Sequence, residues 1–131
     1  MSNIYKISTW LCLILLGLSI QIQSMAQNSD KVRSLKTNYV LQQLELTKSE
    51  QESFLPLYNN YQDELDNIRK KFPTASATDK ISRQEEELQL NKNFITKFKG
   101  IMSVDKVNKI FEAESDFNRK LIEELDKRNH N

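Results

Sequence analysis

Residues 47–72, TKSEQESFLPLYNNYQDELDNIRKKF, decide the fold of this 131-residue chain. Large apolar side chains recur there at alternating steps of four and three residues, the heptad spacing of a helix that packs against another helix. They are Phe54, Tyr58, Tyr61, Leu65, Ile68 and Phe72. The stretch therefore predicts one long amphipathic helix over Lys48–Phe72, about 37 Å in length.

The residues at the start and inside this helix carry further signals. Thr47 and Glu50 have the spacing of a capping box, in which each side chain bonds the other residue's backbone N–H. Pro56 lies inside the pattern and removes one backbone donor, so a kink near Glu52 is expected. Pro73 disfavours helical geometry at the residue before it and ends the helix.

Three further helices are predicted around this one. The first runs over Asp30–Leu44 with Ser29 or Asp30 as its cap, and its apolar positions are Val32, Leu35, Tyr39, Leu41 and Leu44. After a loop at 73–78, the third begins at Thr78 or Asp79 and ends at Gly100, which we expect in a left-handed conformation. Its apolar positions are Ile81, Leu88, Phe94, Ile95 and Phe98.

The last helix is expected to be capped by Ser103. Its apolar positions are Val107, Ile110, Phe111, Phe117, Leu121 and Leu125. Since no stretch alternates in the manner of a strand, the fold class is all-α, with one short and three long helices in hairpins. A compact four-helix bundle and an open, curved hairpin that dimerises both satisfy this pattern.

The first 26 residues have the composition of a secretory signal peptide. Lys6 gives a positive start, residues 10–20 form a short apolar run, and Ser24 and Ala26 are small residues at a cleavage site. The run is about half as long as a membrane-spanning helix requires. We expect cleavage after Ala26, export to the periplasm, and one helical domain over 27–131.

Composition argues against an enzyme. Cys12 is the only cysteine and leaves with the leader, and the only histidine, His130, lies at a chain end where fraying is common. Without these ligands and bases, thiol chemistry, zinc sites and serine–histidine catalysis lack their parts, so we expect no cofactor and no metal. Loss of Lys6 leaves 18 basic and 18 acidic residues, a balance that does not favour nucleic-acid binding.

Two motifs resemble those of a known family. Residues 46–51, LTKSEQ, are followed by FLPLYNNY at 54–61, and residues 102–106 read MSVDK. These stretches resemble the Spy/CpxP (LTXXQ) family of periplasmic proteins, in the branch common in Bacteroidetes. Glu50 and Lys106 stand where the family has Gln; Glu50 can still close a capping box, whereas the ammonium of Lys106 cannot accept a hydrogen bond.

The resemblance implies a thin, cradle-shaped helical homodimer that binds partly unfolded proteins without ATP during envelope stress. The alternative is a sensor or accessory protein of an extracytoplasmic-function sigma-factor system. The motif residues are Leu46, Thr47, Glu50 and Ser103. A client or dimer surface is predicted at Phe54, Tyr58, Tyr61, Leu65, Ile68, Phe111 and Phe117, with plain helix core as the competing interpretation.

Two charged runs each have two interpretations. The run at 69–71, Arg-Lys-Lys, could attract acidic clients or lipid headgroups, or could complement the dipole of its helix end. Glu85, Glu86 and Glu87 could bind a cation, but three consecutive positions point around a helix, which favours a solvated face.

Overall fold

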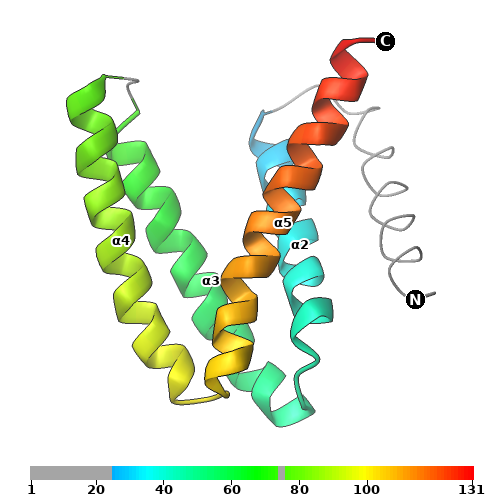
Figure 1. Ribbon diagram of the computed structural model, residues 1–131, viewed down its shortest axis with the longest axis vertical. Coiled ribbons are helices and arrows are strands. Elements are labelled where there is room, and N and C mark those ends of the chain that lie inside the picture. Colours follow the sequence, from blue (N-terminus) through cyan, green and yellow to red (C-terminus); the bar gives the residue numbers. More distant parts are fainter. Residues whose placement is uncertain (1–24, 74–75) are drawn as a thin grey trace. The chain divides into compact units, whose positions relative to one another are not determined.

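Four helices make up the described part of the chain. The computed structural model describes residues 25–73 and 76–131, and none of these residues is in a strand (Figure 1). The helices are α2 (Met25–Leu44), α3 (Lys48–Lys71), α4 (Ala77–Lys99) and α5 (Val104–Asn129). The all-α prediction is confirmed, although the first helix is nearly as long as the others. The leader lies almost wholly outside the described residues, and its cleavage stays a prediction.

The chain divides into two compact units. One is Glu45–Lys109, which contains α3, α4 and the first turns of α5. The other joins the chain up to Leu44 with Ile110–Asn131, so its described helices are α2 and the rest of α5. We call these the hairpin unit and the paired-helix unit. The choice between a cradle and a bundle, and a single domain over 27–131, stay predictions.

The hairpin unit is built on aromatic contacts between α3 and α4, which run side by side (Figure 1). The ring of Tyr61 lies 5.3 Å from Phe94, and that of Phe54 lies 5.7 Å from Phe98. The Tyr61 hydroxyl donates to Asn91 Oδ1 at 2.8 Å. Because residues early in α3 meet residues late in α4, the two helices are antiparallel.

The paired-helix unit places α2 along α5 in the opposite direction (Figure 1). Tyr39 and Phe117 are buried and their rings lie 5.8 Å apart. Val40 is also fully buried, which the sequence pattern of this helix did not indicate.

Several helix ends differ from expectation. α2 begins at Met25 rather than Asp30, because the preceding residues include good helix formers and no glycine or proline. Ser29 and Asp30 therefore lie inside the helix and do not cap it. α4 begins at Ala77 because Ser76 caps it, accepting from the Asp79 N–H at 3.2 Å.

α3 matches its prediction more closely. It runs from Lys48 to Lys71 with Pro56 inside it, and Phe72 is its C-terminal cap. The bend expected near Glu52 stays a prediction.

Gly100 is not left-handed, contrary to the prediction. Its φ of −73° and ψ of −17° are right-handed helical, and its N–H bonds to Lys97 O at 3.1 Å. A Cβ on Gly100 would lie 3.2 Å from that carbonyl, which is closer than ordinary van der Waals contact. Close backbone approach, rather than a positive φ, explains glycine at this turn.

Two apolar patterns were only partly correct. Ile81 and Leu88 were expected in the core of α4 but are 57% and 55% exposed, because α4 meets α3 through the side that carries Leu90, Phe94 and Phe98. On α5, Leu125 is 49% exposed. Each four-residue step turns a position by about 40°, so Leu125 has rotated away from the line of Phe117.

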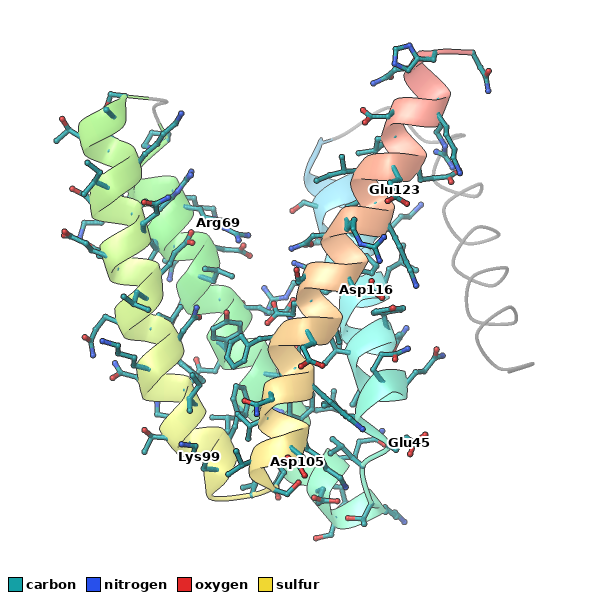
Figure 2. All side chains as sticks on the ribbon, viewed as in Figure 1. Glu45, Arg69, Lys99, Asp105, Asp116 and Glu123 are labelled. Carbon is teal, nitrogen blue, oxygen red and sulfur yellow. The ribbon has the colours of Figure 1, made fainter. Side chains whose placement is uncertain are left out.

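Within residues 25–73 and 76–131, the non-glycine residue with a positive φ is Glu45, at 50°. It directly follows the last residue of α2 (Figure 2). A non-glycine side chain in this conformation costs about 1–2 kcal/mol. Glycine commonly occupies this position after a helix because it has no Cβ.

We predict that Glu45→Gly raises the free energy of unfolding by about 0.5–1 kcal/mol, since the flexibility of unfolded glycine offsets part of the relieved strain. Urea titration measures the change. Glu85→Gly, at an exposed position inside α4, is the matched control and should lower stability by about 0.5–1 kcal/mol. Equal losses in both variants would show that the strain at Glu45 is not real.

Candidate functional site

The predicted motif residues form a junction in the hairpin unit. Thr47 Oγ1 accepts from the Glu50 N–H at 3.2 Å, and Glu50 Oε1 accepts from the Thr47 N–H at 3.0 Å. Both halves of the predicted capping box are therefore present and start α3. Leu46, directly before the box, is half-buried.

The second motif meets the first. Ser103 Oγ accepts from the Lys106 N–H at 3.3 Å, as expected of the residue that caps α5. Lys106 Nζ then donates to Glu50 Oε1 at 2.9 Å and to Glu45 O at 3.4 Å. The ammonium of Lys106 cannot accept the hydrogen bond that would complete a capping box with Ser103. It instead connects the first turn of α5 to the first turn of α3 through Glu50.

This contact shifts the acidity of Glu50. The hydrogen bond from Lys106, followed by the backbone hydrogen bond from Thr47, holds the pKa of the Glu50 carboxyl below its usual range. The contact could have been suspected from the sequence, because an acid and a base replace the two Gln residues of the resembled pattern.

Most of the predicted client or dimer surface is core. Phe54, Tyr58, Tyr61 and Leu65 are buried in α3, and Phe117 is buried in α5. The prediction of an exposed contact surface is wrong for these five side chains. The four on α3 belong to its buried heptad seam, and Phe117 packs against Tyr39 of α2.

Two residues of that predicted surface remain partly accessible. Ile68 and Phe111 are half-buried, one in each unit. Within the hairpin unit, the structure brings the aromatic residues of α3 together in its core.

A polar network in the paired-helix unit was not predicted. The Tyr39 hydroxyl donates to Asp116 Oδ2, and Lys120 Nζ lies 3.1 Å from that hydroxyl and 3.3 Å from Asp116 Oδ2. Arg119 pairs with Asp116 Oδ1 and reaches Glu123 at 3.4 Å (Figure 2). The pairs among Asp116, Arg119, Lys120 and Glu123 follow from helical spacing. The tyrosine comes from another helix, and helical spacing does not predict its contact.

The network changes the pKa of Arg119, which the hydrogen bond to Asp116 raises, and the pKa values of three further groups. Burial and then the hydrogen bond to Asp116 raise the pKa of Tyr39. The hydrogen bond from Tyr39 outweighs the opposing effect of burial and, with Arg119 and Lys120, lowers the pKa of Asp116. Burial alone would lower the pKa of Lys120, but Tyr39 and Asp116 together raise it. All three groups thus keep their ordinary charge states at neutral pH.

The two charged runs lie opposite each other across the α3–α4 hairpin. Arg69 Nε is 3.5 Å from Glu87 Oε1, and Lys71 Nζ is 2.8 Å from Glu86 Oε1. The basic run and the acidic run, which were interpreted separately from the sequence, thus form ion pairs with each other. Exposed pairs of this kind contribute about 0.2–1 kcal/mol each.

Among the described residues, five large apolar side chains are about half exposed or more. They are Ile81, Leu88, Val104, Ile122 and Leu125. Ile122 and Leu125 lie near the end of α5, next to half-buried Leu121. This group is the candidate contact surface that the structure offers in place of the buried one.

In residues 25–73 and 76–131, no group of three or more acidic, histidine or cysteine side chains is arranged to hold a metal ion. None of the helices in these two ranges combines the length and apolar character needed to span a bilayer. Comparison of the chain with family models, curated proteins and solved structures gave no match.

We predict that Lys106→Met raises the pKa of Glu50 and lowers stability at neutral pH. A carboxyl with a depressed pKa stabilises the fold above its unfolded pKa of about 4.3, and this contribution is lost as the pH falls through the folded value. NMR titration of the Glu50 carboxyl and thermal unfolding between pH 7 and acid measure both effects. Lys109→Met, on the exposed side of the same helix, should change neither; an unshifted Glu50 in Lys106→Met would contradict the contact.

We predict that Tyr39→Phe costs about 1–2 kcal/mol at neutral pH, because the hydroxyl bonds a charged carboxylate. The cost should shrink as the pH falls below about 3.9 and Asp116 takes up its proton. Tyr61→Phe, which removes a bond to a neutral amide, should cost about 1 kcal/mol with no such pH dependence. Urea unfolding across this pH range compares the two, and parallel curves would rule out the charged bond.

Proposed function

We propose that this chain is an exported helical protein that holds partly unfolded polypeptides without nucleotide and acts in envelope stress. The observation that carries the proposal is the apolar group on α5, where Ile122 is 60% and Leu125 is 49% exposed. Leu121 lies half-buried beside them. Exposed segments of an unfolded chain are rich in side chains that such a surface would cover.

The surroundings of this group suit reversible holding. Charged side chains flank it along the same helix, among them Arg119, Glu123 and Glu124. Covering one half-exposed aliphatic side chain yields on the order of 1 kcal/mol, so a few such contacts give weak binding and fast release. The flanking charges would keep the complex in solution.

The motif junction supports the proposal in a different way. The capping box at Thr47 and the contact between Glu50 and Lys106 hold the helix starts without using the exposed group on α5. The resemblance of the sequence to Spy/CpxP proteins is the reason for proposing a chaperone. The leader, which has the composition of a signal peptide, is the reason for proposing export. No catalytic role is proposed for any residue.

We predict that the full chain suppresses aggregation of two unrelated model proteins, reduced α-lactalbumin and heat-unfolded citrate synthase, at near-stoichiometric ratios. Combined Ile122→Glu and Leu125→Glu should abolish most of this effect without loss of helix content, because both side chains are exposed. Light scattering measures aggregation, and circular dichroism measures folding.

The matched control is Val104→Glu. Val104 is 55% exposed at the start of the same helix, where an acidic residue suits the helix dipole. This variant should protect as well as the original chain. Failure of the original chain on both clients would exclude general holding, and recovery of one membrane partner by crosslinking would then favour the sensor alternative.

A further inference from the structure

One line of positions along α5, within the paired-helix unit, carries no charge. From Phe111 to Asn129 these positions follow each other at alternating steps of four and three residues, which keeps their side chains on one side of the helix. Phe111 is half-buried and the other five side chains are exposed. We call this line the α5 seam, and it consists of Phe111, Ser115, Asn118, Ile122, Leu125 and Asn129.

The α5 seam is separate from the core of its unit. The contact between α5 and α2 passes through the rings of Phe117 and Tyr39. At 100° per residue, Phe117 lies roughly 140° around α5 from Ile122. The seam therefore does not take part in the packing against α2, and it includes the exposed apolar side chains to which client holding is assigned above.

Charged residues border the seam on both sides. These border positions directly follow or precede a seam residue, and in paired helices such positions bring their charges close to the bound chain. One border consists of Glu112, Arg119 and Asp126, and the other of Glu114, Leu121 and Arg128.

The basic residues of both borders already have acidic partners on α5. Arg119 pairs with Asp116, and it also reaches Glu123 at 3.4 Å. Arg128 Nε lies 3.8 Å from Glu124 Oε1. Because these guanidinium groups lie beside carboxylates, their attraction for the anionic side chains of a ligand is largely offset.

Two acidic residues of the borders have no such partner. Glu112 and Asp126 are exposed, and within the described part of the chain neither forms an ion pair. The third acid, Glu114, is buried. Lys127 is exposed, but it lies roughly 140° around the helix from Ile122. The charge that remains available beside the seam is therefore negative.

We propose that the α5 seam binds extended polypeptide segments in which apolar residues are flanked by lysine or arginine. This inference rests on the proposed function and names the class of client. Ile122 and Leu125 cover apolar side chains of the segment, while Glu112 and Asp126 pair with its cationic ends. The two acids are separated by 14 residues of helix, about 21 Å, a distance that an extended segment spans in about six residues.

NMR titration of the isotopically labelled full chain with two capped peptides tests the preference. The peptide KLSVALK carries lysine at both ends, six residues apart, and ELSVALE differs from it only in the end charges. At low salt the lysine peptide should bind about three- to tenfold more tightly, and it should shift amide signals between 111 and 129. In about 1 M salt, where the Debye length is about 3 Å, the difference should largely disappear.

Substitution of the two acids tests their role. Combined Glu112→Gln and Asp126→Asn should remove the preference for the lysine peptide without changing the melting temperature, because both side chains are exposed. The matched control is Glu52→Gln with Glu64→Gln, which alters the net charge equally at exposed positions of α3 and should keep the preference.

The outcomes separate this inference from client holding itself. Equal affinity of the original chain for the two peptides would overturn the preference for cationic segments and leave client holding in place. An unchanged preference in the Glu112 and Asp126 double variant would likewise overturn the role given to these acids. Failure of both peptides to shift the α5 signals would overturn the inference together with the holding surface on which it rests.

Discussion

The packing of aromatic rings between α3 and α4 is the interaction on which the hairpin unit depends. Tyr61 contacts Phe94 and Phe98, and its hydroxyl bonds Asn91 in the same neighbouring helix. Rings of this size supply much of the apolar area that a short chain can bury. Because they are used inside the hairpin, they are unavailable to other proteins, and contact surfaces must be sought elsewhere on the helices.

The sequence predicted best what depends on near neighbours. The capping box at Thr47 and Glu50 and the heptad seam of α3 are local patterns, and the structure reproduces them. The left-handed conformation predicted for Gly100 is wrong. Glycine permits both a left-handed turn and a close backbone approach, and the sequence alone does not distinguish the two. Ser76 and Thr78 are similar caps by composition, and the sequence pattern does not distinguish between them.

The sequence does not reveal which apolar residues are covered by a neighbouring helix. Ile81 and Leu88 fit a helical stripe as well as Leu90 does, yet only Leu90 faces α3. The network at Tyr39 and Asp116 joins residues far apart in the chain, and helical periodicity carries no information about such pairs. The exposed apolar residues are thus a product of tertiary arrangement, and those on α5 carry the proposed function.

The Glu50 carboxylate accepts from two donors at once, the Thr47 N–H and Lys106 Nζ. The first bond requires only an acceptor at position 50, which an amide could also supply, whereas the second is strengthened by negative charge. Substitutions at positions 50 and 106 are therefore expected to be correlated. Among homologous chains, an acid at one position should accompany a base at the other, and an amide at position 50 should accompany an uncharged residue at position 106.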